Sequence, residues 1–199
     1  MRSMFDQQLK TLNEEMLYMG GLCEDTIQQT IEALMSGDVK KARDLNNMMS
    51  QLTQQERSIE NICLKLLMQQ QPVARDLRTI SSSLKMVTDM ERIGIQACEI
   101  AEIIAAGNVV RATDKVDFQE LSNEVSHMVQ MAMMAYDKKN LDLADEVIKY
   151  DDVVDKLFCD IRGDLIKQLK DDTNDAECFI DMLMIDKYFE RIGDHAVNI

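Results

Sequence analysis

The chain has 199 residues, of which 46% are hydrophobic, 29% are charged and only one is proline. This composition is typical of one or two helix-rich domains with a substantial core, and 16 methionines with 5% aromatic residues argue against a β-sandwich. The 36 acidic residues outnumber the 22 basic ones, so the formal charge is −14 and binding to nucleic acid or to an anionic membrane is not expected.

The cysteines and the hydropathy pattern indicate a protein of the reducing interior of the cell. The five cysteines are far apart in the sequence and form no CxxC pair, which favours buried thiols over disulfides or a zinc knuckle. No apolar run reaches the ~18–20 residues that a spanning helix needs, and the polar start MRSMFDQQLK does not resemble a signal peptide. We therefore expect a soluble, cytoplasmic helical protein.

Three long helices are predicted in the first half of the chain. Apolar residues recur at alternating steps of four and three from Phe5 onward, which predicts an amphipathic helix up to a break at 36–38. Asp38 is placed to cap a second helix, which stops before Pro72, and a third helix ends near Gly107. Helices much longer than the usual ~12 residues must support one another side by side as a bundle.

Three further helices are predicted in the second half. The fourth begins near Asp114 and runs to Asp137, and a turn at 138–140 leads into the fifth. The polar stretch KDDTND at 170–175 separates the fifth helix from the final one, which runs to the end of the chain. Six long helices predict an all-α fold.

The pattern of helices and breaks also repeats. The motif Glu-Arg-Ile-Gly occurs at 91–94 and again at 190–193, which is 99 residues later. The segment SGDVKKARDL at 36–45 resembles KKNLDLADEV at 138–147 under a shift of 102 residues. We therefore predict a duplicated three-helix bundle.

The repeat boundary is predicted after Gly107. The first three-helix repeat then occupies 1–107 and the second occupies 108–199. The counterpart of Gly107 in the second repeat would be residue 206, so we expect a final helix that is about two turns shorter than its counterpart and weakened for that reason.

Carboxylates fall on the predicted core-facing side of the last two helices. Four-residue steps place Asp186, Glu190 and Asp194 on one face of the final helix. The same step places Asp151 and Asp155 on one face of the preceding helix. We expect antiparallel packing to bring two acid pairs together across a groove, where like charges repel unless a cation such as Mg²⁺, Mn²⁺ or iron enters. The alternative interpretation is a solvated face with ordinary salt bridges.

The first half lacks this arrangement of acids. The equivalent positions are Met49, Thr53 and Ile95, none of which carries a carboxylate. Only Glu91 and, further along the same helix, Glu99 remain. The sequence therefore predicts an asymmetric protein, with one competent acidic site in the second half and a degenerate one at Glu91.

The two histidines do not indicate a catalytic centre. Glu124 and His127 have the Glu-x-x-His spacing of ferritin-like di-iron bundles, an architecture that needs two such motifs. The other histidine, His195, has Ile192 at the required position, which argues against a di-iron oxidase or a ferritin. Because His195 follows Asp194 but lies on a different face of the helix, we expect a polar neighbour of the acidic site rather than a ligand. No nucleophile–base pair or phosphate-binding loop is present, so we expect no enzyme activity and no direct phosphate binding.

The repeated Glu-Arg-Ile-Gly motif also carries a family resemblance. The segments QQPVARDLR (70–78), DMERIGIQACEI (89–100) and YFERIGDHAVNI (188–199) resemble the PhoU family of phosphate-signalling regulators over essentially the whole chain. The resemblance implies a cytoplasmic negative regulator of phosphate uptake and of the phosphate-starvation two-component response. It implies an adaptor between the ATPase subunit of a phosphate ABC transporter and a sensor histidine kinase, often as a homodimer. It also implies two three-helix bundles side by side with approximate two-fold symmetry, and metal sites formed by E(D)xxxD motifs.

Only the second repeat carries both of these metal-binding motifs. Asp151 and Asp155 match one motif, and Glu190 and Asp194 match the other, whereas Glu91 matches a single acid position in the first repeat. The resemblance implies iron, manganese, zinc or magnesium as the bound ion. Two further functional hypotheses stay open, namely a metal-storage protein or metal-dependent enzyme built on these carboxylates, and a helical interaction module that binds no metal.

Overall fold

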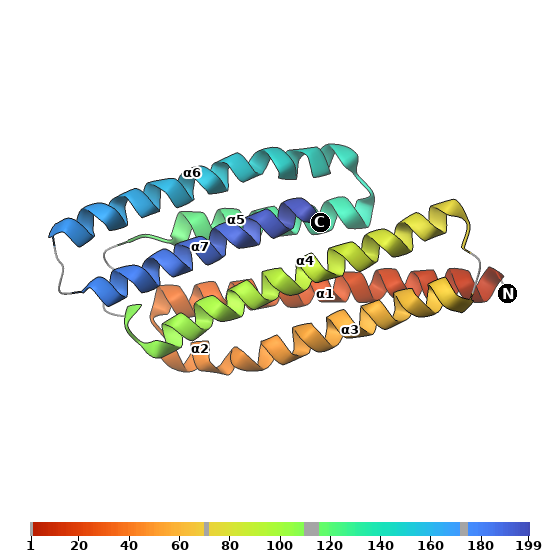
Figure 1. Cartoon of the computed structure of the whole chain (residues 1–199), viewed down its shortest axis with the longest axis horizontal. Helices are drawn as coiled ribbons and strands as arrows, with labels where there is room; N and C mark the ends of the chain where they lie inside the picture. The colour runs from red at the N-terminus through yellow and green to blue at the C-terminus, as the bar shows by residue number, and fades with distance from the viewer. Residues whose placement is uncertain (1, 70–71, 110–115, 172–174) are drawn as a thin grey trace.

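The computed structural model describes residues 2–69, 72–109, 116–171 and 175–199. Long α-helices run through these ranges, which contain no β-strand, so the predicted all-α fold is confirmed (Figure 1). In chain order the helices are α1 (Arg2–Ser36), α2 (Val39–Asp44), α3 (Asn46–Gln69), α4 (Ala74–Ala106), α5 (Gln119–Lys138), α6 (Leu141–Asp171) and α7 (Ala176–Asn198).

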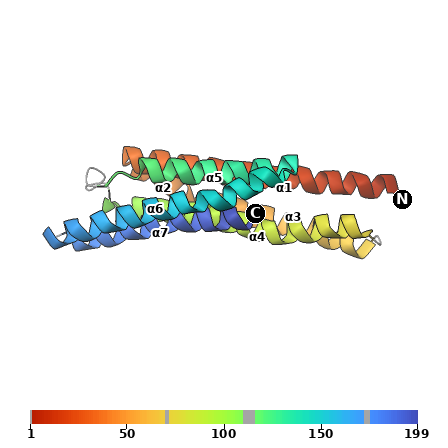
Figure 2. The same cartoon turned by 90° about the horizontal axis from the view of Figure 1, so that it is seen from above.

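The helices form two three-helix bundles that lie side by side. Helices α1, α3 and α4 pack on one another, with the short α2 against α4, and α5, α6 and α7 form the second bundle. Contacts between α4 and α7 and between α1 and α5 join the bundles, as Figures 1 and 2 show. The predicted duplication of a three-helix unit is therefore confirmed.

The predicted helix breaks are formed by local chemistry. Asp38 Oδ1 accepts hydrogen bonds from the backbone amides of Lys40 and Lys41, both at 3.0 Å, so it caps the helix that follows. Gly37 and Lys139 adopt left-handed backbone conformations, with φ of 63° and 51°, at the two breaks predicted from the repeated segments.

Two predicted helix boundaries are wrong. The helix predicted from Asp38 to Pro72 is divided at Leu45 into α2 and α3, and the amide of Met48 bonds to the Leu45 carbonyl at 2.9 Å. Leu45 itself is only 2% exposed, so the bend keeps an apolar side chain in the core. The fourth helix begins at Gln119 rather than near Asp114, which lies outside the described residues. Its N-cap residue is Phe118, and the Asp117 carboxylate accepts the Gln119 amide at 2.8 Å.

Equivalent glycines mark equivalent helix contacts in the two bundles. A Cβ atom built on Gly94 of α4 would collide with Leu52 of α3. Its repeat counterpart, Gly193 of α7, has Val154 of α6 as its nearest neighbour, with 3.2 Å between the built Cβ and Val154 Cγ1. Since Leu52 and Val154 are themselves repeat equivalents, the same helix–helix contact is built twice.

Candidate functional site

The predicted acidic site lies where α6 packs against α7. Asp151 Oδ1 lies 3.7 Å from the position that a Cβ of Gly193 would occupy, so the carboxylate of α6 rests against the backbone of α7. A Cβ atom at Gly193 would make only an ordinary van der Waals contact with this carboxylate. Helix packing thus places an acid of α6 beside the helix that carries the second Glu-Arg-Ile-Gly motif.

The charges of the four predicted acids act on one another. The pKa of Asp151 is raised to about 6, first by burial and then by the negative charges of Asp155, Asp194 and Glu190. Asp151 and Glu190 are half-buried, whereas Asp155 and Asp194 are exposed. The structure therefore brings the acids of both motifs into one negative field at the edge of the second bundle.

Lysine and arginine side chains lie beside these acids, and one of them pairs with Glu190. Lys187 Nζ donates to Glu190 Oε2 at 2.6 Å. A cavity of about 570 Å³ opens beside Asp151 and Asp194 and connects the site to α4 of the other bundle. Its lining residues come from three helices and are Arg92, Gln96, Asp151, Arg191, Asp194, His195, Val197 and Asn198.

A fifth carboxylate lies deeper than the predicted four. Asp186, one turn before Glu190 on α7, is fully buried, and neither of its carboxylate oxygens has a hydrogen-bond partner. Burial and the charge of Glu190 raise the pKa of Asp186 to about 8, against the lowering effect of Arg162 and Lys187. The four-residue spacing placed Asp186 on the core-facing side of the final helix, and packing decides that it alone of these acids is fully buried.

The equivalent site of the first bundle is built differently. Thr53 Oγ1 donates to Glu91 Oε1 at 2.8 Å, so a hydroxyl stands where the second bundle has the carboxylate of Asp155. Sequence comparison of the repeats missed two further acids, Glu56 and Glu60 of α3. Burial and then the charges of Glu60 and Glu91 raise the pKa of Glu56, which shows that these acids lie near Glu91. Their four-residue spacing was the available sign.

The chemistry of these side chains fits a hard cation, because every donor is a carboxylate oxygen. The buried Asp186 does not add to this charge at neutral pH, because burial raises its pKa to about 8 and keeps the carboxyl group mostly protonated. Within the described residues, however, no group of three or more His, Cys, Asp or Glu side chains is already placed to hold a metal ion. Ion binding at Asp151, Asp155, Glu190 and Asp194 stays a prediction and requires these side chains to rotate toward one another.

The histidines have partners other than the acidic site. His195 Nδ1 lies 2.9 Å from Asp89 Oδ1, a contact that crosses from α7 to α4. Asn198 Nδ2 donates to the same Asp89 oxygen at 3.2 Å. The repeat-related bond runs from Tyr188 Oη to Glu99 Oε2 at 3.4 Å, so the two bundles meet through a pair of symmetry-equivalent contacts.

The pair Glu124 and His127 is engaged by Tyr150 of α6. Tyr150 donates a short hydrogen bond to the Glu124 carboxylate. The His127 ring meets the edge of the same tyrosine ring at 5.5 Å between centroids. These contacts account for the Glu-x-x-His spacing as a packing arrangement between α5 and α6.

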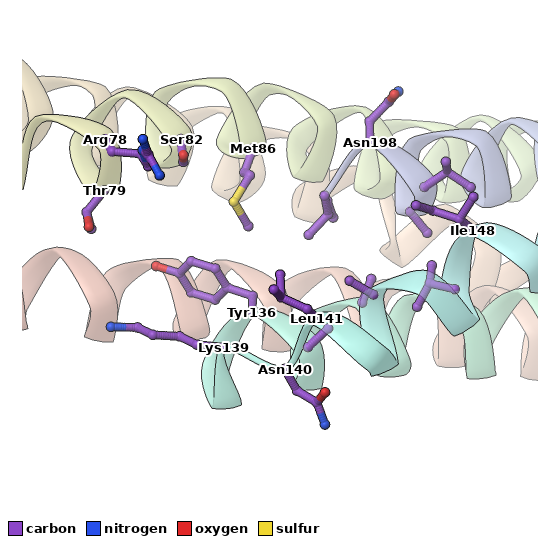
Figure 3. A pocket seen from close by; sticks show the side chains of 17 residues that line it. Arg78, Thr79, Ser82, Met86, Tyr136, Lys139, Asn140, Leu141, Ile148 and Asn198 are labelled. Atoms are coloured by element: carbon purple, nitrogen blue, oxygen red, sulfur yellow. The ribbon is translucent and has the colours of Figure 1, made fainter. Parts of the chain in front are cut away.

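A second, mostly apolar cavity continues along α4 from the C-terminal end of α7. It has a volume of about 540 Å³. Figure 3 shows Ser82 and Met86 of α4 on one wall, with Tyr136 and Leu141 opposite them. No acid lines this cavity, so it is distinct in chemistry from the acidic site.

No helix in the described part of the chain combines the length and the apolar character that crossing a bilayer demands.

Comparisons with known proteins point to one family. The sequence model of the PhoU domain matches residues 16–104 and 118–199. The chain is 36% identical over 200 residues to a protein of Clostridium acetobutylicum named phosphate-specific transport system accessory protein PhoU homolog, and the alignment covers 100% of this chain and 91% of that relative.

Solved structures agree in fold. The crystal structure of PhoU from Pseudomonas aeruginosa superposes with a TM-score of 0.92 at 30% identity, covering 98% of this chain and 94% of that one. The phosphate transport system regulatory protein PhoU from Streptococcus pneumoniae superposes with a TM-score of 0.89 at 23% identity, covering 98% of this chain and 92% of that one.

Proposed function

Because the chain belongs to the PhoU family, we propose that it is an accessory protein of a phosphate-specific transport system and restrains phosphate uptake when phosphate is plentiful. The observation that carries the proposal is whole-chain similarity, since both repeats match the family and the 36%-identical relative aligns over 100% of the chain. The relatives are named as accessory proteins, which supports the expectation that this chain is not an enzyme.

The finer mechanism we propose is that of an adaptor. The protein binds, in the cytoplasm and as a homodimer, both the ATPase subunit of the phosphate transporter and a sensor histidine kinase, and it holds the kinase in its non-signalling state. Such a role needs different affinities for two partner states and no reaction chemistry. Long helices packed along their length suit it, because they present extended faces to large partners.

The acidic site is proposed to bind a metal ion as part of this role. Asp151 and Asp155 of α6 and Glu190 and Asp194 of α7 would hold it, with Glu91 at the weaker site of the first bundle. The ion, whether magnesium, manganese, iron or zinc, would supply positive charge that offsets the burial and the repulsion that together raise the pKa of Asp151. Binding to the folded state alone would stabilise that state by mass action.

The adaptor proposal is tested by co-purification of the full chain with the tagged ATPase subunit, and separately with the kinase, at high and low phosphate. We expect retention of both partners at high phosphate and weaker retention of the kinase at low phosphate. Absence of both partners at every phosphate concentration would contradict the proposal. An unrelated acidic helical protein of similar size serves as the control for non-specific capture.

A metal-free interaction module is the second candidate. It is favoured by the finding that, in the ranges the structure describes, no three metal-binding side chains are placed to hold an ion. Elemental analysis after dialysis against mixed divalent cations separates the two, with Asp151→Ala/Asp194→Ala as the comparison variant. Metal retained by the wild type and lost in the variant supports the metal-binding adaptor. Equal, negligible metal in both supports the module.

A further inference from the structure

Exposed apolar side chains gather where α3 ends and α4 begins. Met68, next to the last residue of α3, is 85% exposed, and Val73, which immediately precedes α4, is 61% exposed. One turn further back on each helix, Leu64 and Leu77 are exposed as well. We call these four residues the apolar tip. Single exposed apolar residues are ordinary, but several gathered at one end of a molecule indicate a contact surface.

The apolar tip projects from the molecule. Figures 1 and 2 show the first bundle extending past the second at this end, where α1 also begins. Met4 of α1 adds another exposed apolar side chain there. Neither of the two cavities described above is lined by any of the four tip residues. The tip is therefore a convex apex rather than a groove, so its shape suits insertion into another surface.

Basic side chains accompany the apolar tip. Lys65 of α3 and both Arg75 and Arg78 of α4 are exposed. The sequence from Lys65 to Thr88 contains four basic residues and a single acid, Asp76, although acids outnumber bases by 36 to 22 in the whole chain. Among the described residues, no ion pair ties the side chains of these three exposed cations to an acid. Their charges are free to meet an anionic surface.

Most of the acids of the first bundle lie far from this end. Along α4 the next acid after Asp76 is Asp89, thirteen residues and about 20 Å further on. Along α3, Glu60 precedes Met68 by eight residues, or about 12 Å. Charges more than about 8 Å apart are largely screened at physiological salt. Asp6 of α1 is exposed at the same end, so three exposed cations face two acids.

We propose that the apolar tip inserts shallowly into an anionic lipid surface. Met68 and Val73 enter the boundary between the headgroups and the acyl chains. Lys65, Arg75 and Arg78 then contact the phosphates of the headgroups. The formal charge of −14 argues against membrane binding for the chain as a whole, but the local charge at this end has the opposite sign.

The order of the side chains favours a lipid surface over an acidic protein. The most exposed apolar groups lie next to the turn, and cations lie beside them and one turn behind, which matches the layers of a bilayer interface. The proposal goes beyond the proposed function, because it requires neither the ATPase subunit, nor the kinase, nor a metal ion.

The test is co-sedimentation of the full chain with vesicles of equal parts phosphatidylglycerol and phosphatidylcholine, and with vesicles of phosphatidylcholine alone. We expect binding to the anionic vesicles to be about tenfold or more tighter, and to weaken as NaCl is raised. Met68→Ser/Val73→Ser removes the apolar apex, and Arg75→Glu/Arg78→Glu reverses its charge. Each double variant should lose about tenfold or more in affinity. All four side chains are exposed, so the fold should persist, which circular dichroism checks.

Matched variants at the other end of the molecule and on α6 control for general effects. Ile180→Ser/Leu183→Ser removes exposed apolar side chains of α7 near the turn that follows α6. Lys156→Glu/Lys167→Glu reverses two exposed charges of α6 and changes the net charge as much as the arginine variant does. We expect both controls to change the affinity by about twofold or less. A loss in the controls as large as that in the tip variants overturns the proposal.

Fluorescence separates insertion from attraction to the surface. The chain contains no tryptophan, so Val73→Trp introduces a single reporter at the apex. We expect its emission to shift to shorter wavelength on anionic vesicles, whereas that of Ile180→Trp should stay unchanged. Binding without a shift of the Val73→Trp emission overturns the insertion.

Absence of binding to anionic vesicles overturns the lipid proposal as a whole. If Met68→Ser/Val73→Ser then abolishes co-purification with the ATPase subunit, the apolar tip is a protein-docking surface instead. Co-purification of the wild type decides the proposed function separately, because it does not depend on vesicles.

Discussion

The two bundles share a backbone plan and differ in where they place charge. At the repeat-equivalent helix crossings, the first bundle has Leu52 against Gly94 and the second has Val154 against Gly193. Two turns before each glycine the side chains differ, because α4 carries the buried Val87 where α7 carries the buried Asp186. In both halves the helix crossing pairs a glycine with an aliphatic side chain. Two turns away, the same buried position holds a valine in one half and an acid in the other.

The facing helices differ in the opposite sense. Helix α3 carries Glu56 and Glu60 beside Glu91, and the repeat-equivalent positions of α6 are Phe158 and Arg162. The first bundle therefore places its extra acids on its middle helix at a half-exposed edge, where water screens them. The second bundle buries its extra acid on α7, where the loss of water and the charge of Glu190 raise the pKa of the carboxyl group.

The largest expected effect comes from moving the buried acid to the other half. Val87→Asp places a carboxyl group in a fully buried position with no partner, and we expect a loss of about 3–5 kcal/mol in the free energy of unfolding. Urea denaturation at neutral pH measures it, with Val87→Ala as the control for lost volume. A loss no greater than that of Val87→Ala would mean that α4 tolerates the acid, and the comparison between the bundles would fail.

The reverse substitution should stabilise the protein and change its pH dependence. Replacing the unpartnered acid in Asp186→Val is expected to gain about 1–3 kcal/mol at neutral pH, before any metal is added. The pKa of Asp186 is raised from 3.8 to about 8 in the folded state, so the folded chain binds more protons than the unfolded chain between these values. Stability contributed by Asp186 therefore falls as pH rises through this window.

Unfolding free energies measured from pH 4 to pH 8 test this prediction in metal-free buffer. The difference between Asp186→Val and the wild type should widen as pH rises, because burial and the charge of Glu190 oppose the ionisation of Asp186 and outweigh the assistance of Arg162 and Lys187. A difference that stays constant across the range would show that Asp186 ionises normally in the folded protein.

The two crossing glycines should differ in their tolerance of a methyl group. Gly94→Ala forces a Cβ into the fully buried Leu52, and we expect it to cost about 1–3 kcal/mol. Gly193→Ala meets Val154 Cγ1 at 3.2 Å, a milder contact, and should cost less than about 1 kcal/mol because alanine favours the helix.

Gly163→Ala on α6 is the matched control, since nothing lies within 4 Å of its Cβ position, and it should be stabilising. Equal effects at Gly94 and Gly193 in thermal unfolding would contradict the difference in packing between the crossings.

The smallest effects are expected at the contacts that join the bundles. Asp89→Ala removes an acceptor shared by His195 and Asn198 and should cost about 1 kcal/mol, whereas Tyr188→Phe removes one long hydrogen bond to Glu99 and should cost about 0.5 kcal/mol or less. Differential scanning calorimetry of both variants measures the difference. A larger loss for Tyr188→Phe would reverse the assignment of Asp89 as the stronger link.

Local features of the sequence were sufficient for most of the fold. Asp38 could be identified as a helix cap from its place before a helical pattern, and the break at 36–38 follows from Gly37. The bend at Leu45 was not predictable, because a leucine in a helical conformation carries no local sign of a break. The start of α5 was placed too early, because its N-cap residue, Phe118, makes no side-chain cap bond and gives no local sign of a helix start.

The candidate site was predictable in part. The spacing of Asp151 and Asp155, and of Glu190 and Asp194, identified which acids share a helix face, and the raised pKa of Asp151 shows that the two faces meet. The proximity of Glu56 to Glu91 was missed, because comparing repeats residue by residue hides an acid that has moved by a turn.

The sequence by itself determined the helices, their duplication and the family, because periodicity, caps and motifs are properties of neighbours along the chain. Only the tertiary structure decided which of the acids lose water. Asp186 and Asp194 lie on related positions of one helix, yet the first is fully buried and the second is exposed, because the neighbouring helices cover one part of α7 and leave the other open. Burial depends on what packs across from a residue, and that is settled by the assembled bundle.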